Sequence, residues 1–164
     1  MVIFGCSFKA LKDLEWFQNY QFPKVSDALG QVKMTVSQIH AGKQHNVVPA
    51  VLNFVVDCRV TDAYTNEEIA EIVAKNTACD VKPRSLRLNS SSINANHEIV
   101  KVGLKFGKKT YGSPTLSDQC RLTCPSLKLG PGDSLRSHSA DEFIYLKEVK
   151  EGVKFYIQLL EEIV

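Results

Sequence analysis

The sequence lacks any long hydrophobic run, and none of its apolar stretches approaches the roughly 20 residues that a membrane-spanning helix requires. It also lacks a charge imbalance, because 20 Lys and Arg residues stand against 18 Asp and Glu residues and the basic ones are scattered. These absences argue against a nucleic-acid partner and against an anionic membrane. The first six residues are too few for a signal peptide and have no basic flank. What remains is the composition of a globular protein with one ordinary domain or two very small ones.

The cysteines do not form the pattern of a disulfide framework. There are five of them, an odd number, and Cys58 lies inside a strand pattern where a small apolar residue fits. Cys120 and Cys124 are four residues apart, whereas a zinc knuckle has a two-residue spacer. We therefore predict reduced thiols and a cytoplasmic protein.

Hydrophobic periodicity predicts four helices, over residues 8–20, 66–77, 97–108 and 140–162. Two of these helices have a capping box at their start, formed by Thr65 with Glu68 and by Ser139 with Glu142. Alternation predicts four strands, over residues 32–39, 47–60, 84–88 and 127–129. The register of the second strand is clear from Leu52 onward, which places Arg59 on its polar face.

The first part of the chain therefore has the order helix, strand, strand, helix, strand. One more strand in front would complete the split βαβ pattern of a ferredoxin-like domain. Almost nothing precedes the first helix except residues 2–4, so we expect a domain that lacks its first strand. That strand would be central, and its loss should destabilise the sheet. The polar run NSSSINAN predicts a boundary, with domains over residues 1–90 and 91–164.

The most informative stretch is SLKLGPGDSLRSHSADEF, residues 126–143. A Gly-Pro-Gly break follows the short strand, and the next helix is predicted to start directly after His138. A histidine between a strand and a helix lies where open α/β sheets bind their ligands, and a neutral imidazole can bind a metal or move a proton. An ordinary loop histidine is the alternative, and the spacing alone does not choose between them.

This stretch carries a resemblance, together with PTLSDQ at residues 114–119 and the motifs IHAGKQHNVVP and FVVDCR. They resemble the C-terminal portion of the acetylornithine deacetylase, succinyl-diaminopimelate desuccinylase and carboxypeptidase family of zinc-dependent amidohydrolases, most closely its acetylornithine deacetylase branch. The resemblance implies an α+β fold: a ferredoxin-like lid or dimerisation domain lacking its first strand, then an α/β C-terminal segment of the catalytic domain. It also implies homodimers formed through the lid, a zinc or cobalt cofactor, and hydrolysis of N-acyl amino acids.

The resemblance also assigns roles to individual residues. His138 matches a metal ligand of the family, and Asn46 and Arg59 match lid residues that hold the substrate carboxylate, to which an Arg can make bidentate bonds. His45, beside Asn46, is a candidate contact for the tetrahedral oxyanion, although the family's lid histidine for that role precedes the first lid helix. From the residues alone, Asn46 can equally be a turn former, and Arg59 can be a solvated strand charge paired with Asp57.

Two loops complete the expected site. The loops that contain Ser117, Asp118, Gly130 and Gly132 would line the cleft and offer backbone N–H groups to anions.

Most of the family's catalytic machinery has no counterpart in this sequence. No His-x-Asp motif occurs, and the pairs Glu67-Glu68 and Glu161-Glu162 lie on helix surfaces, so no residue is assigned a catalytic role. We therefore expect a fragment or truncated relative that is inactive alone and does not hold zinc or cobalt tightly. A non-catalytic dimerisation module and a poorly stable fragment are the alternatives.

Overall fold

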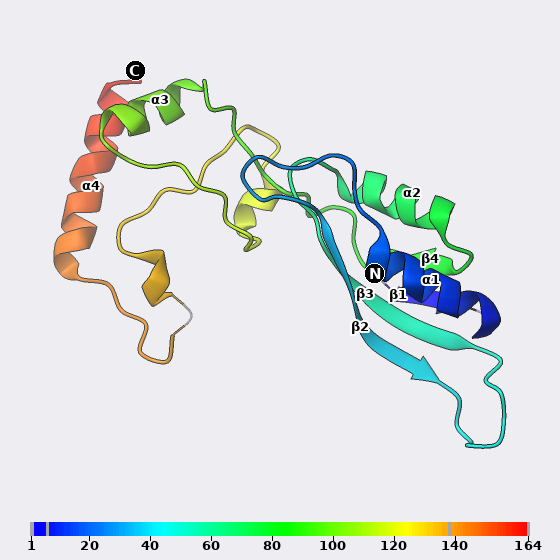
Figure 1. The fold of residues 1–164 in the computed structure, drawn as a ribbon. Coiled ribbons are helices and arrows are strands. Elements are labelled where there is room, and N and C mark those ends of the chain that lie inside the picture. Colours follow the sequence, from blue (N-terminus) through cyan, green and yellow to red (C-terminus); the bar gives the residue numbers. More distant parts are fainter. Residues whose placement is uncertain (1, 6, 138, 164) are drawn as a thin grey trace. The chain divides into compact units, whose positions relative to one another are not determined.

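The computed structural model describes residues 2–5, 7–137 and 139–163 of the 164-residue chain. These residues form two compact units (Figure 1). Unit 1 contains Met1–Ser91 and Gly112–Thr123, and unit 2 contains Ser92–Tyr111 and Cys124–Val164. No helix in the described part of the chain has both the length and the apolarity needed to cross a bilayer.

Unit 1 is built on a four-stranded antiparallel sheet with the order β2-β3-β1-β4. The strands are β1 (Val2–Gly5), β2 (Lys33–Ala41), β3 (Leu52–Arg59) and β4 (Asp80–Lys82). Helices α1 (Ser7–Asn19) and α2 (Asn66–Asn76) follow β1 and β3. The order βαββαβ with β1 in the centre is the split βαβ pattern of a ferredoxin-like domain.

The prediction that the first strand is missing is wrong. Val2–Gly5 forms β1, which pairs on one side with β3 and on the other with β4, so that Ile3 lies opposite both Phe54 and Val81. Four residues give too short a pattern to be recognised as a strand, but two neighbouring ladders satisfy the backbone of this segment on both sides.

The last strand of the sheet also differs from its prediction. It forms at Asp80–Lys82, where it pairs with β1, and not at residues 84–88. The later segment is instead held at the start of α2, because the Asn66 side chain donates to the Leu86 carbonyl (3.2 Å) and Asn89 Oδ1 accepts from the Asn66 N–H (2.7 Å).

Strand β2 contains a bulge that the alternation did not reveal. Val36 pairs with Val56, but after a shift at Ser37 it is Ile39, not Gln38, that pairs with Phe54. The Ser37 hydroxyl donates to the Val55 carbonyl (3.2 Å) at this point. The bulge therefore moves Ile39 from the polar to the apolar side of the strand.

The core of unit 1 lies between the sheet and its helices. Phe54 and Val56 of β3 are fully buried, and the Phe54 ring packs edge-on against Phe17 of α1 at 5.7 Å. Asp13, on the buried side of α1, accepts a hydrogen bond from the Ala78 N–H (3.0 Å) just before β4. The predicted capping box of α2 is confirmed: Thr65 Oγ1 accepts from the Glu68 N–H, and the Glu68 carboxylate accepts from the Thr65 N–H.

Unit 2 contains α3 (Glu98–Lys105) and α4 (Leu146–Glu161), which pack through the rings of Phe106 and Phe155 at 5.8 Å. Residues 127–129 have no regular secondary structure, so the short strand predicted there does not form. The Tyr156 hydroxyl donates to the Leu129 carbonyl and holds this segment against α4.

The predicted start of the last helix is wrong as well. Helix α4 begins at Leu146, six residues later than expected, and the Ser139 hydroxyl donates to the Arg136 carbonyl (2.8 Å) instead of capping a helix. The residue that accepts at the true helix start is Glu148, whose carboxylate receives the Tyr145 N–H at 2.9 Å.

Candidate functional site

His45 and Asn46 lie in the loop that joins β2 to β3. Both side chains are exposed, and Figure 1 shows this hairpin extending from the sheet to its loop. Gly42 begins the loop with a φ of +64°, and a Cβ there would lie 3.1 Å from Pro49 Cγ, so glycine is favoured at this position. The loop exposes apolar side chains too: Val48 is 76% exposed.

Arg59 lies at the opposite end of the same hairpin. It is the last residue of β3 and pairs with Lys33, whereas Leu52, the first residue of β3, pairs with Ala41 at the loop end. Seven residue steps at about 3.3 Å each separate these ends by about 23 Å. A single chain therefore does not bring Asn46 and Arg59 together at one carboxylate.

The Arg59 side chain has a local partner. Its Nε donates to Asp57 Oδ2 at 2.7 Å, and the two side chains are 73% and 51% exposed. This is the surface ion pair that the strand pattern offered as the alternative, and such an exposed pair contributes little to stability. The remaining guanidinium donors stay accessible from solvent.

Ser117 and Asp118 belong to unit 1. Asp118 opens a short 3₁₀ helix, η1 (Asp118–Arg121), and its carboxylate is fully exposed, 3.9 Å from the Arg121 guanidinium. The segment is fixed by Gly112, where a Cβ would lie only 2.7 Å from the Ala28 carbonyl oxygen. The loop therefore packs against the turn between α1 and β2.

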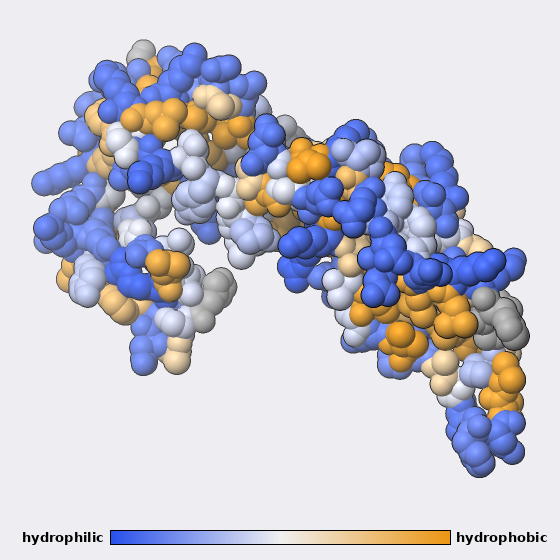
Figure 2. All heavy atoms as spheres, viewed as in Figure 1, coloured by the Kyte–Doolittle hydropathy of each residue, from blue (hydrophilic) through white to orange (hydrophobic). Residues whose placement is uncertain are grey.

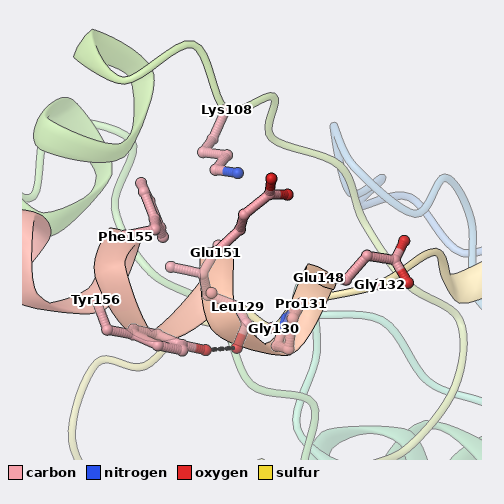
Figure 3. Close-up of a pocket in the computed structure, with 10 residues that line it drawn as sticks. Lys108, Leu129, Gly130, Pro131, Gly132, Glu148, Glu151, Phe155 and Tyr156 are labelled. Carbon is pink, nitrogen blue, oxygen red and sulfur yellow. Dashed lines mark hydrogen bonds between the residues drawn. The ribbon is translucent and has the colours of Figure 1, made fainter. Parts of the chain in front are cut away.

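Gly130 and Gly132 belong to unit 2, where they line a shallow hollow of about 170 Å³ (Figure 3). Gly132 has a φ of +87°, and a Cβ at Gly152 would lie 2.9 Å from Pro131, so the loop approaches α4 closely. In Figure 3, Lys108 and Glu151 point toward each other across the hollow, and Lys108 Nζ lies 4.4 Å from the centre of the Phe155 ring.

His138 lies outside the described residues, but the chain on either side of it is well anchored. Arg136 makes two bonds to the Glu148 carboxylate, at 3.0 and 2.5 Å, and its guanidinium lies over the rings of Phe143 and Tyr145 at 5.0 and 5.3 Å. The hydrogen bonds from Arg136 and, after them, the bond from the Tyr145 N–H hold the pKa of the Glu148 carboxyl below its usual range. The sequence pattern does not reveal this cluster, because only the fold brings Arg136 to Glu148.

The described residues do not fit a metal centre. No group of three or more His, Cys, Asp or Glu side chains among residues 2–5, 7–137 and 139–163 is arranged to hold a metal ion. Burial raises the pKa of the Cys58 and Cys79 thiols to about 11, so neither offers a thiolate near neutral pH. Cys58, Cys79, Cys120 and Cys124 are all free thiols, and Cys6 lies outside the described residues.

Comparison with known proteins agrees with this fold. Residues 8–84 match the family model of the peptidase dimerisation domain of the M20 family. The chain is 27% identical over 171 aligned positions to a LysW-lysine/LysW-ornithine hydrolase of Saccharolobus solfataricus. A hydrolase of the same name from Saccharolobus islandicus strain L.S.2.15 is 26% identical.

Each alignment covers 99% of this chain but 47% of the relative, so the chain spans about half the length of the curated relatives it matches. The resemblance to this amidohydrolase family is confirmed: the chain contains an M20 dimerisation domain and is a distant relative of M20 hydrolases.

Proposed function

We propose that this chain, which carries the dimerisation domain of the M20 peptidase family, is the pairing lid of a hydrolase of N-acyl amino acids and is not catalytic by itself. The observation that carries the proposal is the free edge of β2 in a complete ferredoxin-like sheet. Because the described residues do not form a metal centre, we place the catalytic chemistry in the half of the relatives that this chain does not span.

Strand β2 is suited to pair with a second copy. It has nine residues, lies at the edge of the described sheet and has β3 on one side only, so one row of its N–H and C=O groups faces outward. Helix α1 packs on β2 and exposes 68% of Leu11. Figure 2 shows further hydrophobic residues at the surface of the sheet and hairpin region. A two-fold axis would join two β2 edges antiparallel into one continuous sheet.

Such pairing would bring together Asn46 and Arg59 side chains that lie far apart within one copy. In an antiparallel β2–β2 pair centred on Ser37, Ala41 of one copy would lie near Lys33 of the partner subunit. Arg59 of the partner subunit would then lie one strand farther on, because Lys33 and Arg59 are register partners. Ala41 of one copy and Arg59 of the partner subunit would then be two strand spacings apart, about 10 Å. Within one chain, the two ends of β3 are about 23 Å apart. We propose that Asn46, assisted by His45, and the partner's Arg59 hold the two ends of one bound substrate.

The chemistry of these residues fits an amino-acid substrate. The guanidinium of Arg59 can bind a carboxylate with two parallel hydrogen bonds, and the Asn46 amide can donate to a carbonyl or carboxylate oxygen. The relatives are named for lysine and ornithine, and we propose a basic amino acid with an acylated amino group as the substrate. Zinc or cobalt, with His138 as one ligand, would belong to the complete enzyme.

Light scattering of the purified chain tests the pairing. We expect a species of twice 18.3 kDa that a Thr35→Lys/Gln38→Lys variant converts to the monomer, because both side chains are exposed on β2. Ala74→Lys, on the exposed side of α2, adds the same kind of charge away from this edge and should leave the dimer intact. A wild-type monomer, or a dimer insensitive to the β2 variant, would contradict the proposal.

An activity assay tests the second half of the proposal. We expect no hydrolysis of N-acetylornithine by the chain alone, with or without added zinc or cobalt. Turnover that is removed by a chelator would refute the proposal that the chain is not catalytic, whatever its oligomeric state.

A further inference from the structure

Helix α4 has a covered side and, directly beside it, an exposed apolar stripe. At about 100° per residue, its covered side spans an arc of about 100°. The residues on this arc are buried or half-buried: Glu148, Gly152, Phe155, Tyr156 and Leu159. They pack on α3 and on the loop at Leu129–Pro131 within unit 2.

A second apolar stripe lies directly beside the covered one. Leu146, Val149, Val153, Ile157 and Leu160 fall within an arc of about 80°. They are 79%, 39%, 56%, 52% and 56% exposed. We call these five residues the outer stripe. Phe143 and Ile144, just before the helix, are 51% and 46% exposed and extend the apolar surface.

The polar residues of α4 occupy what is left of its circumference. Lys147, Lys150, Glu151, Lys154, Gln158 and Glu161 fall within an arc of about 100° on the opposite side. A helix at the surface of a domain needs only one apolar stripe of about that width. The covered side and the outer stripe of α4 together span about 200°, which leaves room for packing contacts on two sides of the helix.

The size of the relatives indicates what covers the outer stripe. This chain spans 47% of their length, so about as much chain again belongs to the same kind of protein. Contiguous exposed apolar surface of this kind marks a protein contact. The outer stripe is uncharged and straight, which suits the flat apolar face of a sheet or of a second helix layer.

We propose that the outer stripe of α4 binds the remaining half of an M20 hydrolase, so that the two halves assemble as separate polypeptides when they are mixed. This assembly uses unit 2 and is independent of pairing through β2, so either can fail without the other.

Cysteine labelling gives a direct test with a matched control. Val153→Cys places a thiol on the outer stripe, and Lys154→Cys places one on the neighbouring polar arc. The probe is the part of the Saccharolobus solfataricus relative that lies outside the matched region. We expect this polypeptide to slow alkylation at position 153 at least tenfold and to leave position 154 unchanged, with mass spectrometry separating these sites from the native thiols.

Two controls make every outcome decisive. Without the added half, positions 153 and 154 should be alkylated at similar rates. If position 153 were alkylated slowly and position 154 were not, unit 1 or a second copy would cover the outer stripe, and the proposal would be overturned. Absence of protection by the added half at saturating concentration would also overturn it. Val153→Asp/Ile157→Asp should abolish capture of the added half, whereas Lys154→Asp/Gln158→Asp should retain it and circular dichroism should match for both variants.

Discussion

Replacing Ile3 by proline tests whether the first strand is part of the sheet. Ile3 lies opposite Phe54 on one side and Val81 on the other, so its N–H points into one of two ladders. Proline has no N–H, and whichever neighbour accepts that bond loses its donor. If residues 2–5 were only a leader in front of α1, the same substitution would have no effect on stability.

The expected cost follows from the central position of β1. One ladder hydrogen bond is lost, an acceptor inside the sheet is left unpaired, and the pyrrolidine ring crowds the neighbouring strand. Together these effects amount to about 3 kcal/mol. With an m-value of about 1.5 kcal/mol/M in urea, the midpoint of unfolding should fall by about 2 M. Ile3→Val keeps the N–H and should cost at most about 1.5 kcal/mol.

Tryptophan fluorescence provides an assay for this unit alone. Trp16 is the single tryptophan of the chain, and it packs in unit 1 against Phe17 and Tyr20, with ring centres 5.1 and 4.5 Å away. A urea titration followed at Trp16 should place Ile3→Pro far below wild type and Ile3→Val close to it. A midpoint for Ile3→Pro equal to that of Ile3→Val would refute the assignment of β1 to the sheet centre.

Three further predictions concern single side chains. Burial raises the pKa of Cys58 to about 11 from 9.0, so its thiolate fraction at pH 8 is about 100-fold below that of an unfolded thiol. Alkylation of Cys58 should be slower in the native protein by that factor, and equal rates in native and urea-unfolded protein would contradict the prediction. The stability that the protonated thiol contributes should be lost as the pH rises from about 9 to about 11. Arg136 and the Tyr145 N–H lower the pKa of Glu148, so this carboxylate stabilises the fold above its ordinary pKa of 4.5, and that stability is lost as the pH falls through the lower, folded value. Limited proteolysis of the loop after Arg136 should therefore accelerate in acid. Glu148→Gln should make cleavage fast at neutral pH as well. A wild-type cleavage rate that does not change with pH would contradict the role of the Arg136–Glu148 pair. Thr65→Ala should destabilise unit 1 by about 1 kcal/mol in the Trp16 assay, because Thr65 caps α2, while Thr123→Ala in an exposed loop should be neutral; equal effects would contradict the role of the cap.

Features set by neighbouring residues were readable from the sequence only where one local arrangement was available to the side chains. The capping box of Thr65 and Glu68 was predicted and forms as expected. The same pattern at Ser139 and Glu142 does not start a helix, because the Ser139 hydroxyl donates back to Arg136, and Glu148 takes the role at the true start of α4. A capping pattern gives the local chemistry of a helix start but not the contacts that place it.

Features set by strand pairing were not readable in the same way. The backbone of residues 2–5 becomes a strand because β3 and β4 lie on either side of it, and those strands are some 50 and 80 positions away. The bulge at Ser37 likewise depends on how β2 meets Val55 and Phe54. Alternation along one segment contains no information about either.

The candidate site shows the same division. Motif resemblance led to Asn46 and Arg59 as a pair, and the sequence correctly placed Arg59 on the polar face of a strand. Their separation along β3 follows only from the hairpin geometry, which puts the two residues at opposite ends. The sequence therefore supplied the residues of the site, and the fold supplied the reason to look for a second copy.

The path of the chain between its two units limits how this protein can be recombined. The chain leaves unit 1 after Ser91, returns at Gly112 and leaves again after Thr123. The returning segment is wedged against the Ala28 carbonyl through Gly112, which has no room for a side chain. A chimera joined at the obvious boundary after Ser91 would inherit the returning segment from the wrong parent. Exchange between homologues should therefore succeed only when residues 112–123 are transferred together with the sheet.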